Sequence, residues 1–263
     1  MEIPRPRSRS SSTSSSTCSG SPLALDPSVL ELLNSHLAEK AEEEARFKAL
    51  EAEHVAARLA GLDVEDDDAG REDKPMISLD DYKKTFGEDW QLSQFWYSNE
   101  FADHLSTKLH GMCTRETKIA FMCSPTAFVS FQHMKQLPGA HVFEVDSRFA
   151  ALSPRQFVPY DLDSPDDFPK KFQGFFDIVV VDPPFLNEVT NVKVSSTIRQ
   201  IIKPNGKLLL LTSTSVEDIV KKVYSEPPLG PLRKTALDVQ HGQLANDFAS
   251  WGNWDGAEEF GRD

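Results

Sequence analysis

The sequence is poor in cysteine, with only Cys18, Cys113 and Cys123 among its 263 residues. This odd number and these spacings match neither a disulfide framework nor a zinc site, and the seven histidines form no H-x-x-x-H pair. The chain also lacks an apolar run of the roughly 20 residues that a membrane-spanning helix needs, and its first residues lack the apolar stretch of a secretory signal. We therefore expect a cytoplasmic protein with no structural metal and no membrane segment.

A glycine-rich G-x-G-x-x-G pattern is absent as well, which argues against an enzyme that binds NAD or FAD. Positive charge is also in short supply. The formal net charge is −13, and residues 81–263 contain 24 acidic against 19 basic residues. An acidic domain repels the phosphates of a nucleic acid unless it has a local basic groove. The charge balance thus favours a basic protein partner over a large DNA footprint.

The first 75 residues differ in composition from the rest of the chain. Residues 1–24 are rich in serine and proline, which is typical of a disordered tail. Residues 26–60 predict a mostly polar, solvated helix that begins with an Asp-Pro pair, and residues 62–74 form an acidic linker. Apolar residues recur at helical spacing in this helix: Leu30, Leu33, Leu37 and Ala41. We expect a tail at 1–24, a helix and linker at 25–75, and a folded domain at 76–263.

In that domain, short apolar runs alternate with helical patterns. Strands are expected at 118–123, 141–145, 156–160, 177–181 and 207–212, with further candidates at 235–239 and 248–251. Helices are expected at 125–136, 188–202 and 213–224, and K-P-N-G at 203–206 predicts a turn. Nearly continuous apolar strands separated by helices indicate an α/β fold, a mostly parallel sheet with helices on both faces.

Polar residues follow the ends of the first four predicted strands. In chain order they are Ser124 and Pro125, Glu144 and Asp146, Asp161, and Asp182. In open α/β sheets, ligands bind beyond the carboxyl ends of the strands, where an acid can accept a hydrogen bond from a ribose. One acid at a strand end is common, but acids at three successive ends suit a ligand with hydroxyl groups and an amino-bearing base.

The stretch D-P-P-F at residues 182–185 is the sharpest chemical signal. Asp182 supplies a carboxylate acceptor, and Pro184 restricts Pro183 to extended geometry, so that the Pro183 carbonyl points outward as a second acceptor. Phe185 adds a flat apolar face. Two acceptors and a ring can bind a nitrogen through its N–H groups and leave its lone pair free, as in-line methyl transfer to an amine requires.

D-P-P-F resembles the [D/N]-P-P-[Y/F/W] signature of S-adenosylmethionine-dependent amino methyltransferases, which follows the fourth strand of a seven-stranded Rossmann-like sheet. Four blocks extend the likeness: E-D-W-Q-L-S-Q-F-W-Y-S (88–98), E-V-D-S-R-F (144–149), F-D-I-V-V-V-D-P-P-F-L (176–186) and L-A-N-D-F (244–248). Together they resemble the protein-lysine methyltransferases of translation elongation factor 1-alpha, a branch formerly described as adenine-specific DNA methyltransferases. The likeness covers about residues 76–255.

The resemblance implies an enzyme that uses S-adenosylmethionine to methylate a lysine of elongation factor 1-alpha, and we expect this enzyme to be a cytoplasmic monomer. By motif, the D-P-P-F residues hold the amine and Asp146 meets the ribose of the cofactor. The strand-end residues Ser124, Pro125, Glu144 and Asp161 are expected to bind the cofactor. The resemblance implies that Trp90, Gln91, Ser93 and Gln94 line the cofactor or the substrate mouth, with Trp90 and Gln94 expected at the cofactor. Trp96 and Tyr97 are expected to form walls of the substrate mouth. Phe95 and Trp96 are also expected to pack in part against the sheet.

Two other functions fit parts of the sequence. In a nucleic-acid adenine methyltransferase, the same motif would bind the exocyclic amine, with Phe185 stacking on a flipped base. That activity needs a basic groove and usually a target-recognition insertion, whereas the longest gap between predicted strands, residues 161–176, is acidic. The third possibility is a non-catalytic binding module, which the intact D-P-P-F disfavours.

Overall fold

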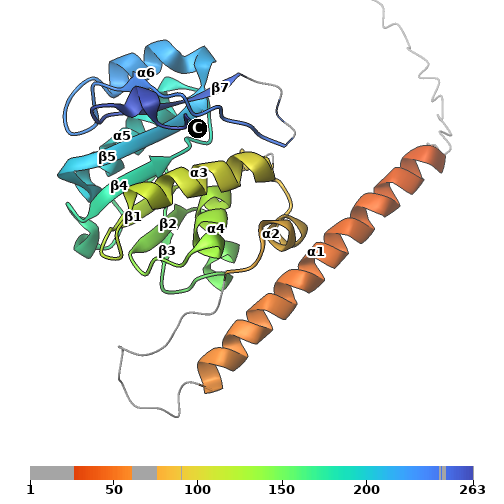
Figure 1. Ribbon diagram of the computed structural model, residues 1–263. Coiled ribbons are helices and arrows are strands. Elements are labelled where there is room, and N and C mark those ends of the chain that lie inside the picture. Colours follow the sequence, from red (N-terminus) through yellow and green to blue (C-terminus); the bar gives the residue numbers. More distant parts are fainter. Residues whose placement is uncertain (1–26, 61–75, 90, 243, 245–246, 263) are drawn as a thin grey trace, which may run out of the picture. The chain divides into compact units, whose positions relative to one another are not determined.

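The computed structural model describes residues 27–60, 76–89, 91–242, 244 and 247–262 (Figure 1). The predicted tail at 1–24 and the acidic linker at 62–74 lie outside the described residues. The chain divides into two compact units after Ala41, so that residues 42–60 belong to the same unit as the α/β domain. No helix among the described residues combines the length and the apolar character needed to cross a membrane.

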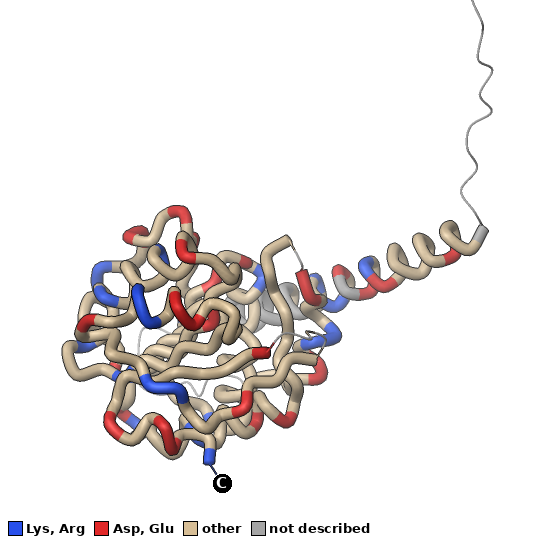
Figure 2. The backbone as a smooth tube through the Cα atoms, turned by 90° about the horizontal axis from the view of Figure 1, so that it is seen from above, with Lys and Arg blue, Asp and Glu red and all other residues tan. Residues whose placement is uncertain are grey.

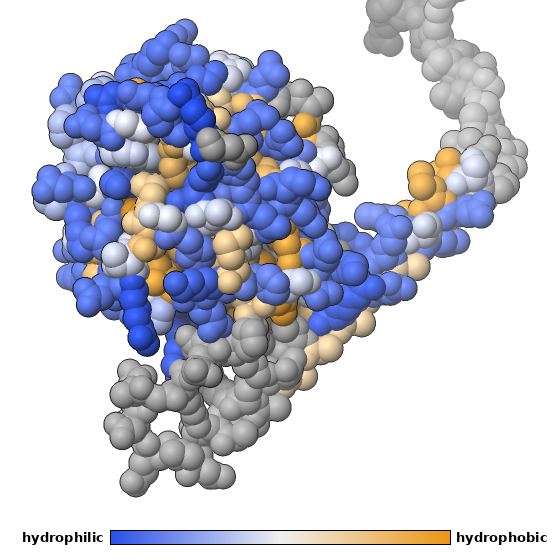
Figure 3. Space-filling model, in the orientation of Figure 1, coloured by the Kyte–Doolittle hydropathy of each residue, from blue (hydrophilic) through white to orange (hydrophobic). Residues whose placement is uncertain are grey.

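The predicted N-terminal helix is present as α1 (Pro27–Ala60). Its residues Leu30, Leu33 and Leu37 are exposed, as expected for a solvated helix. Figure 3 shows apolar side chains gathered near the N-terminal end of this helix. Farther along, the ring of Phe47 packs edge-on against that of Phe86 in the α/β domain, with 6.1 Å between the ring centroids.

Seven strands form one sheet in the order β3-β2-β1-β4-β5-β7-β6, as Figure 1 shows for most of them. The strands are β1 (Ile119–Met122), β2 (Ala140–Glu144), β3 (Phe157–Pro159), β4 (Phe176–Val181), β5 (Ile202–Ser213), β6 (Arg233–Lys234) and β7 (Phe248–Gly252). The first five pair in parallel, whereas β7 runs antiparallel to both β5 and β6. The strand order reverses between β1 and β4, so their carboxyl ends form the position at which such sheets bind ligands.

Successive strand residues point to opposite faces of the sheet and feed two separate cores. Phe121 and Val180 belong to one core, and their neighbours Met122 and Val181 belong to the other. The first core is covered by α2 (Leu79–Thr85), α3 (Asn99–Met112) and α4 (Pro125–Met134), and the second by α5 (Glu188–Ile201) and α6 (Glu217–Val223). Both faces are therefore buried, which explains why these strands are apolar throughout. The predicted seven-stranded, mostly parallel sheet with helices on both faces is confirmed.

Two local predictions were wrong. K-P-N-G at 203–206 lies within β5 rather than in a turn before it. Phe176 of β4 pairs with Ile202, but Ile178, two residues later, pairs with Lys207. The extra β5 residues between these two pairs therefore bulge from the ladder. The stretch 235–239 is irregular, and the strand beside β7 is β6 instead. The stretch 235–239 has an alternating apolar pattern because residues such as Leu237 are buried in the core, although they belong to no strand.

Candidate active site

A cavity of about 420 Å³ lies at the carboxyl ends of the first four strands. Each of these strands contributes residues at its carboxyl end: Cys123–Thr126 after β1, the last β2 residue Glu144 and the following Val145, Tyr160–Asp163 after β3, and Asp182–Leu186 after β4. Residues 92–97, Thr190 and Lys193 of α5, and a C-terminal group complete the lining: His241, Leu244 and Phe248. The structure thus brings most of the predicted site residues to one place.

Asp182 comes directly after β4 at the cavity. Its backbone N–H donates a hydrogen bond to the Met122 carbonyl at the end of β1 (3.1 Å), and its Oδ2 accepts one from the Tyr97 hydroxyl (2.6 Å). His241 Nε2 lies 3.8 Å from the same oxygen, which is too far for a hydrogen bond. Burial and the Asp182 charge raise the pKa of Tyr97, so its hydroxyl keeps its proton and remains a donor. Tyr97 therefore restricts how the carboxylate can turn.

The two prolines end the strand, but their carbonyls have different environments. The Ser93 hydroxyl donates a hydrogen bond to the Pro184 carbonyl. No described residue donates one to the Pro183 carbonyl, so that oxygen is available as the second acceptor that the sequence predicts. Phe185 stands beside these acceptors at the cavity, with 44% of its surface exposed. The motif therefore offers a carboxylate, a carbonyl and an aromatic face to an incoming group.

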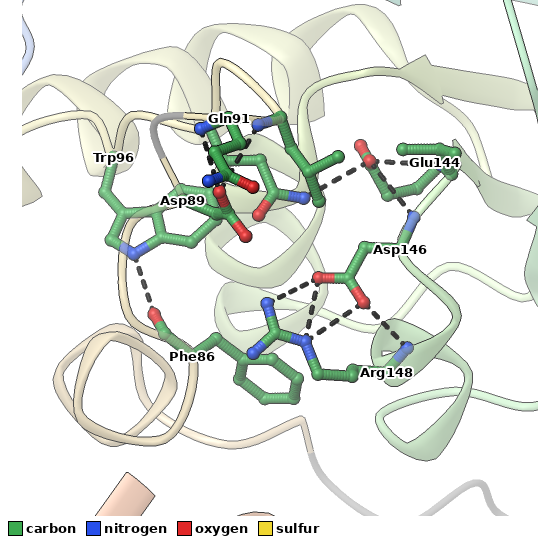
Figure 4. Close-up of polar contacts among 10 residues, drawn as sticks. Phe86, Asp89, Gln91, Trp96, Glu144, Asp146 and Arg148 are labelled. Carbon is green, nitrogen blue, oxygen red and sulfur yellow. Dashed lines mark hydrogen bonds and ion pairs between the residues drawn. The ribbon is translucent and has the colours of Figure 1, made fainter. Parts of the chain in front are cut away.

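The loop at residues 88–97 is held together by acidic side chains of its own. Asp89 Oδ1 accepts a hydrogen bond from the Gln91 backbone N–H (2.9 Å), and both residues appear in Figure 4. Ser93 follows with a φ of 55°, in the left-handed region that residues with a Cβ rarely adopt. This turn directs the Ser93 hydroxyl to the D-P-P-F segment. The loop thus contacts the motif at two points, through Ser93 at the Pro184 carbonyl and through Tyr97 at the Asp182 carboxylate.

Trp96 is mainly a core residue, in line with the expectation that it packs in part against the sheet. Its indole N–H donates to the Phe86 carbonyl at 2.8 Å (Figure 4), and its ring packs against that of Tyr82, with centroids 5.2 Å apart. Of the two residues expected to form walls of the mouth, Tyr97 is the one that contacts Asp182. Trp90 lies outside the described residues.

A tight turn connects β1 to α4 and adds a polar group to the cavity. Cys123 is in the left-handed region with a φ of 51°, and its backbone N–H donates to the Phe143 carbonyl on β2 (2.9 Å). Ser124 follows, and its buried hydroxyl has no hydrogen-bond partner among the described residues. Pro125 begins α4, where a missing N–H leaves no helical hydrogen bond unmade. Because buried hydroxyls normally find partners, Ser124 is a candidate ligand contact.

Two acids lie at the end of β2, Glu144 as its last residue and Asp146 two residues later, and they point in different directions (Figure 4). Glu144 lines the cavity, where its Oε1 accepts hydrogen bonds from the Val145 backbone N–H (3.1 Å) and the Gln94 side-chain amide (3.4 Å). Asp146 does not line it. Arg148 holds the Asp146 carboxylate through Nε, at 2.9 and 3.0 Å, and through Nη2, at 2.7 Å. The resemblance assigned the ribose to Asp146, but the geometry favours Glu144 for that contact.

The remaining predicted acid, Asp161, is exposed on the cavity rim. His241 was not among the predicted site residues, because the seven histidines show no H-x-x-x-H pair or other motif. It packs against Tyr97 and Phe248, with ring centroids 4.9 and 4.3 Å apart. An isolated bridge pairs the backbones of Tyr97 and His241, two residues far apart in the chain, so no local pattern could have revealed this contact.

A family model described as "Probable N6-adenine methyltransferase" matches residues 88–256, which include the whole cavity lining. The chain belongs to this family. The chain is also similar to the yeast (Saccharomyces cerevisiae) "Protein-lysine N-methyltransferase EFM5", with 32% identity over 80% of this chain and 87% of the yeast protein. The human "EEF1A lysine methyltransferase 1" is 31% identical over 73% of this chain and 84% of its own length. A Caenorhabditis elegans "Protein-lysine N-methyltransferase M142.8" is 33% identical over 64% and 78%.

The cavity of this methyltransferase suits the cofactor that the sequence resemblance implies, S-adenosylmethionine. Two of its lining residues, Ser124 and Gln94, each have a buried polar side-chain atom, Oγ and Oε1 respectively, with no hydrogen-bond partner among the described residues. Glu144 adds a carboxylate at the end of β2, the position at which such sheets bind a ribose. Burial raises the pKa of Glu144 to about 7, a cost that hydroxyl donors would reduce by stabilising the charged form.

Proposed function

We propose that this protein is an S-adenosylmethionine-dependent protein-lysine N-methyltransferase that acts as a monomer on a lysine of translation elongation factor 1-alpha. The observation that carries the proposal is the acceptor geometry of the D-P-P-F motif, which lines an acidic, partly apolar cavity. The similarity to protein-lysine N-methyltransferases supports a lysine of a protein as the acceptor.

S-adenosylmethionine, when bound, supplies an electrophilic methyl group on a sulfonium. In the proposed mechanism Ser124, Gln94 and Glu144 hold it by hydrogen bonds, and the D-P-P-F residues orient the lysine. Asp182 and the Pro183 carbonyl accept hydrogen bonds from the lysine nitrogen, which directs its lone pair toward the methyl group. The protein's contribution is therefore chiefly positioning.

The lysine must lose a proton before it can attack. Its unperturbed pKa is about 10.4, so the neutral form is a small minority at pH 7. The Asp182 carboxylate stabilises the ammonium form and helps binding, whereas the apolar surface of Phe185 favours the neutral amine. Loss of the proton to water is sufficient for the reaction. Phe185 also offers a cation–π contact of about 0.5–2 kcal/mol to a partly methylated ammonium group.

The charge distribution favours a lysine over a nucleic-acid base. Basic and acidic positions are interspersed along the described backbone (Figure 2). Among the described lining residues, the only lysine or arginine is Lys193, and its Nζ is paired with Asp163 Oδ1 at 2.5 Å. A duplex would bring phosphates to this rim and find few cations to neutralise them. The adenine activity in the family description is nevertheless the second candidate, because the same acceptors fit an exocyclic amine.

The test is a transfer assay with labelled S-adenosylmethionine and purified elongation factor 1-alpha, duplex DNA, or neither. We expect label only on the protein. Label on DNA alone would refute the lysine proposal in favour of the adenine activity, and label on neither would favour a non-catalytic module.

An Asp182→Ala variant should lose transfer while cofactor binding stays largely intact. The matched control is Asp255→Ala, which removes a fully exposed acid outside the cavity and should leave the rate unchanged. Near-normal turnover in the Asp182 variant would show that the motif does not hold the acceptor.

A further inference from the structure

Large exposed apolar residues of the α/β domain are concentrated beside the active-site cavity. Among the described residues from 76 onward there are seven, and four of them line the cavity: Leu92, Val145, Phe185 and Leu186. Two more, Val189 and Val192, lie on α5 within seven residues of Phe185. The seventh, Met134, neither lines the cavity nor lies near these residues in the chain. Singly scattered apolar residues are normal on protein surfaces, but a cluster beside a functional site is typical of an interaction surface.

Phe185, Leu186, Val189 and Val192 form what we call the mouth strip. Val189 and Val192 are three residues apart on a helix and therefore share one face of α5. They are 64% and 48% exposed, whereas Val194 on the other side of α5 is fully buried. The two valines are thus not needed to attach α5 to the sheet.

The helix that carries the strip is firmly anchored. Asn187 caps its first turn by accepting a hydrogen bond from the Thr190 backbone N–H (2.9 Å). The fully buried Asn191 accepts one from the Tyr224 hydroxyl (3.1 Å), and Glu188 pairs with Lys222 at 2.5 Å. The strip is therefore a preformed apolar surface, which reduces the entropy lost when a partner binds.

We infer that the mouth strip is the docking surface of the methyl-acceptor protein, and that apolar side chains beside its target lysine cover Val189 and Val192. This inference rests on the proposed function. The strip begins at Phe185 within the motif that would hold the lysine, so one partner surface reaches both. Apolar side chains provide no partner for phosphates, which makes a protein rather than a nucleic acid the expected occupant.

The experiment measures KM and kcat for purified elongation factor 1-alpha, together with the Kd for S-adenosylmethionine, in four proteins. These are the wild type, the double variants Val189→Asp/Val192→Asp and Val189→Lys/Val192→Lys, and the control Met134→Asp. Met134 is also exposed (43%) but is the last residue of α4, whereas the cavity lies at the start of that helix. We expect both double variants to raise KM about tenfold or more, because a charged side chain cannot replace the apolar contact with the substrate. A tenfold change corresponds to about 1.4 kcal/mol. Their kcat should stay within about twofold of the wild type, because neither valine lines the cavity. Their cofactor Kd should also stay within about twofold, which would show that the variants are folded.

Each other result overturns the inference. Unchanged KM in both double variants would show that the strip does not dock the substrate, while the proposed function would stand. Opposite changes in the Asp and Lys variants would indicate electrostatic attraction instead of apolar burial. An equal rise in Met134→Asp would indicate a non-specific effect. If the wild type labels DNA and not the protein, the proposed function fails, and the inferred occupant fails with it.

Discussion

Glu144 is a carboxyl group buried at the cavity, and burial raises its pKa from the ordinary 4.5 to about 7. Hydrogen bonds from the backbone N–H groups of Asp146 and Val145 oppose this shift without cancelling it. The folded protein therefore keeps a proton on Glu144 over a range of pH in which the unfolded chain has already lost it.

The sign and the size of the effect on stability follow from this difference. Between pH 4.5 and about 7 the folded state binds more protons than the unfolded state, so the free energy of unfolding falls as pH rises through this window. Each pKa unit corresponds to about 1.4 kcal/mol. The full shift therefore corresponds to a loss of about 3 kcal/mol by pH 8, relative to a protein whose side chain at this position stays neutral.

Glu144→Gln provides that neutral reference, because glutamine keeps the shape and one acceptor oxygen but cannot ionise. Urea unfolding of both proteins from pH 5 to pH 8, at fixed ionic strength, measures the difference in the free energy of unfolding. We expect the variant to be more stable by about 1 kcal/mol at pH 5 and by about 3 kcal/mol at pH 8. Titration of all other groups is common to both proteins and cancels. Parallel stability profiles would refute the reasoning.

Three further substitutions separate the roles of neighbouring residues. Tyr97→Phe removes the hydrogen bond to Asp182 and should lower kcat/KM about tenfold with an unchanged cofactor Kd, since a hydrogen bond to a charged group contributes about 1.5–3 kcal/mol; an unchanged kcat/KM would contradict this. Ser124→Val should leave stability within about 1 kcal/mol yet weaken S-adenosylmethionine binding in calorimetry, because its hydroxyl has no partner among the described residues; equal affinity would show that the hydroxyl does not contact the cofactor. Arg148→Ala leaves the buried Asp146 carboxylate unpaired and should cost about 3 kcal/mol of stability with little change in cofactor Kd; the opposite result would return the ribose contact to Asp146.

Much of the fold follows from local sequence patterns. The parallel strands are apolar on both faces because helices cover both, so β1, β2, β4 and most of β5 stand out as short apolar runs. Local patterns failed where pairing decides the structure. The K-P-N-G segment has turn chemistry but lies in a bulged part of β5, and the 235–239 stretch alternates like a strand without forming one.

The amino-acid sequence by itself determined the acceptor chemistry of the site, because D-P-P-F joins a carboxylate, two prolines and a ring within four residues. Only the tertiary structure decided which groups surround it. Arg148 draws Asp146 away from the cavity and leaves Glu144 there, while the pairing of Tyr97 with His241 brings a distant histidine close to Asp182. Tyr97 and His241 are far apart in the chain, and Glu144 and Asp146 are neighbouring residues of the same charge. In both cases the packing of the folded chain, not the local sequence pattern, decides which residue lies at the cavity.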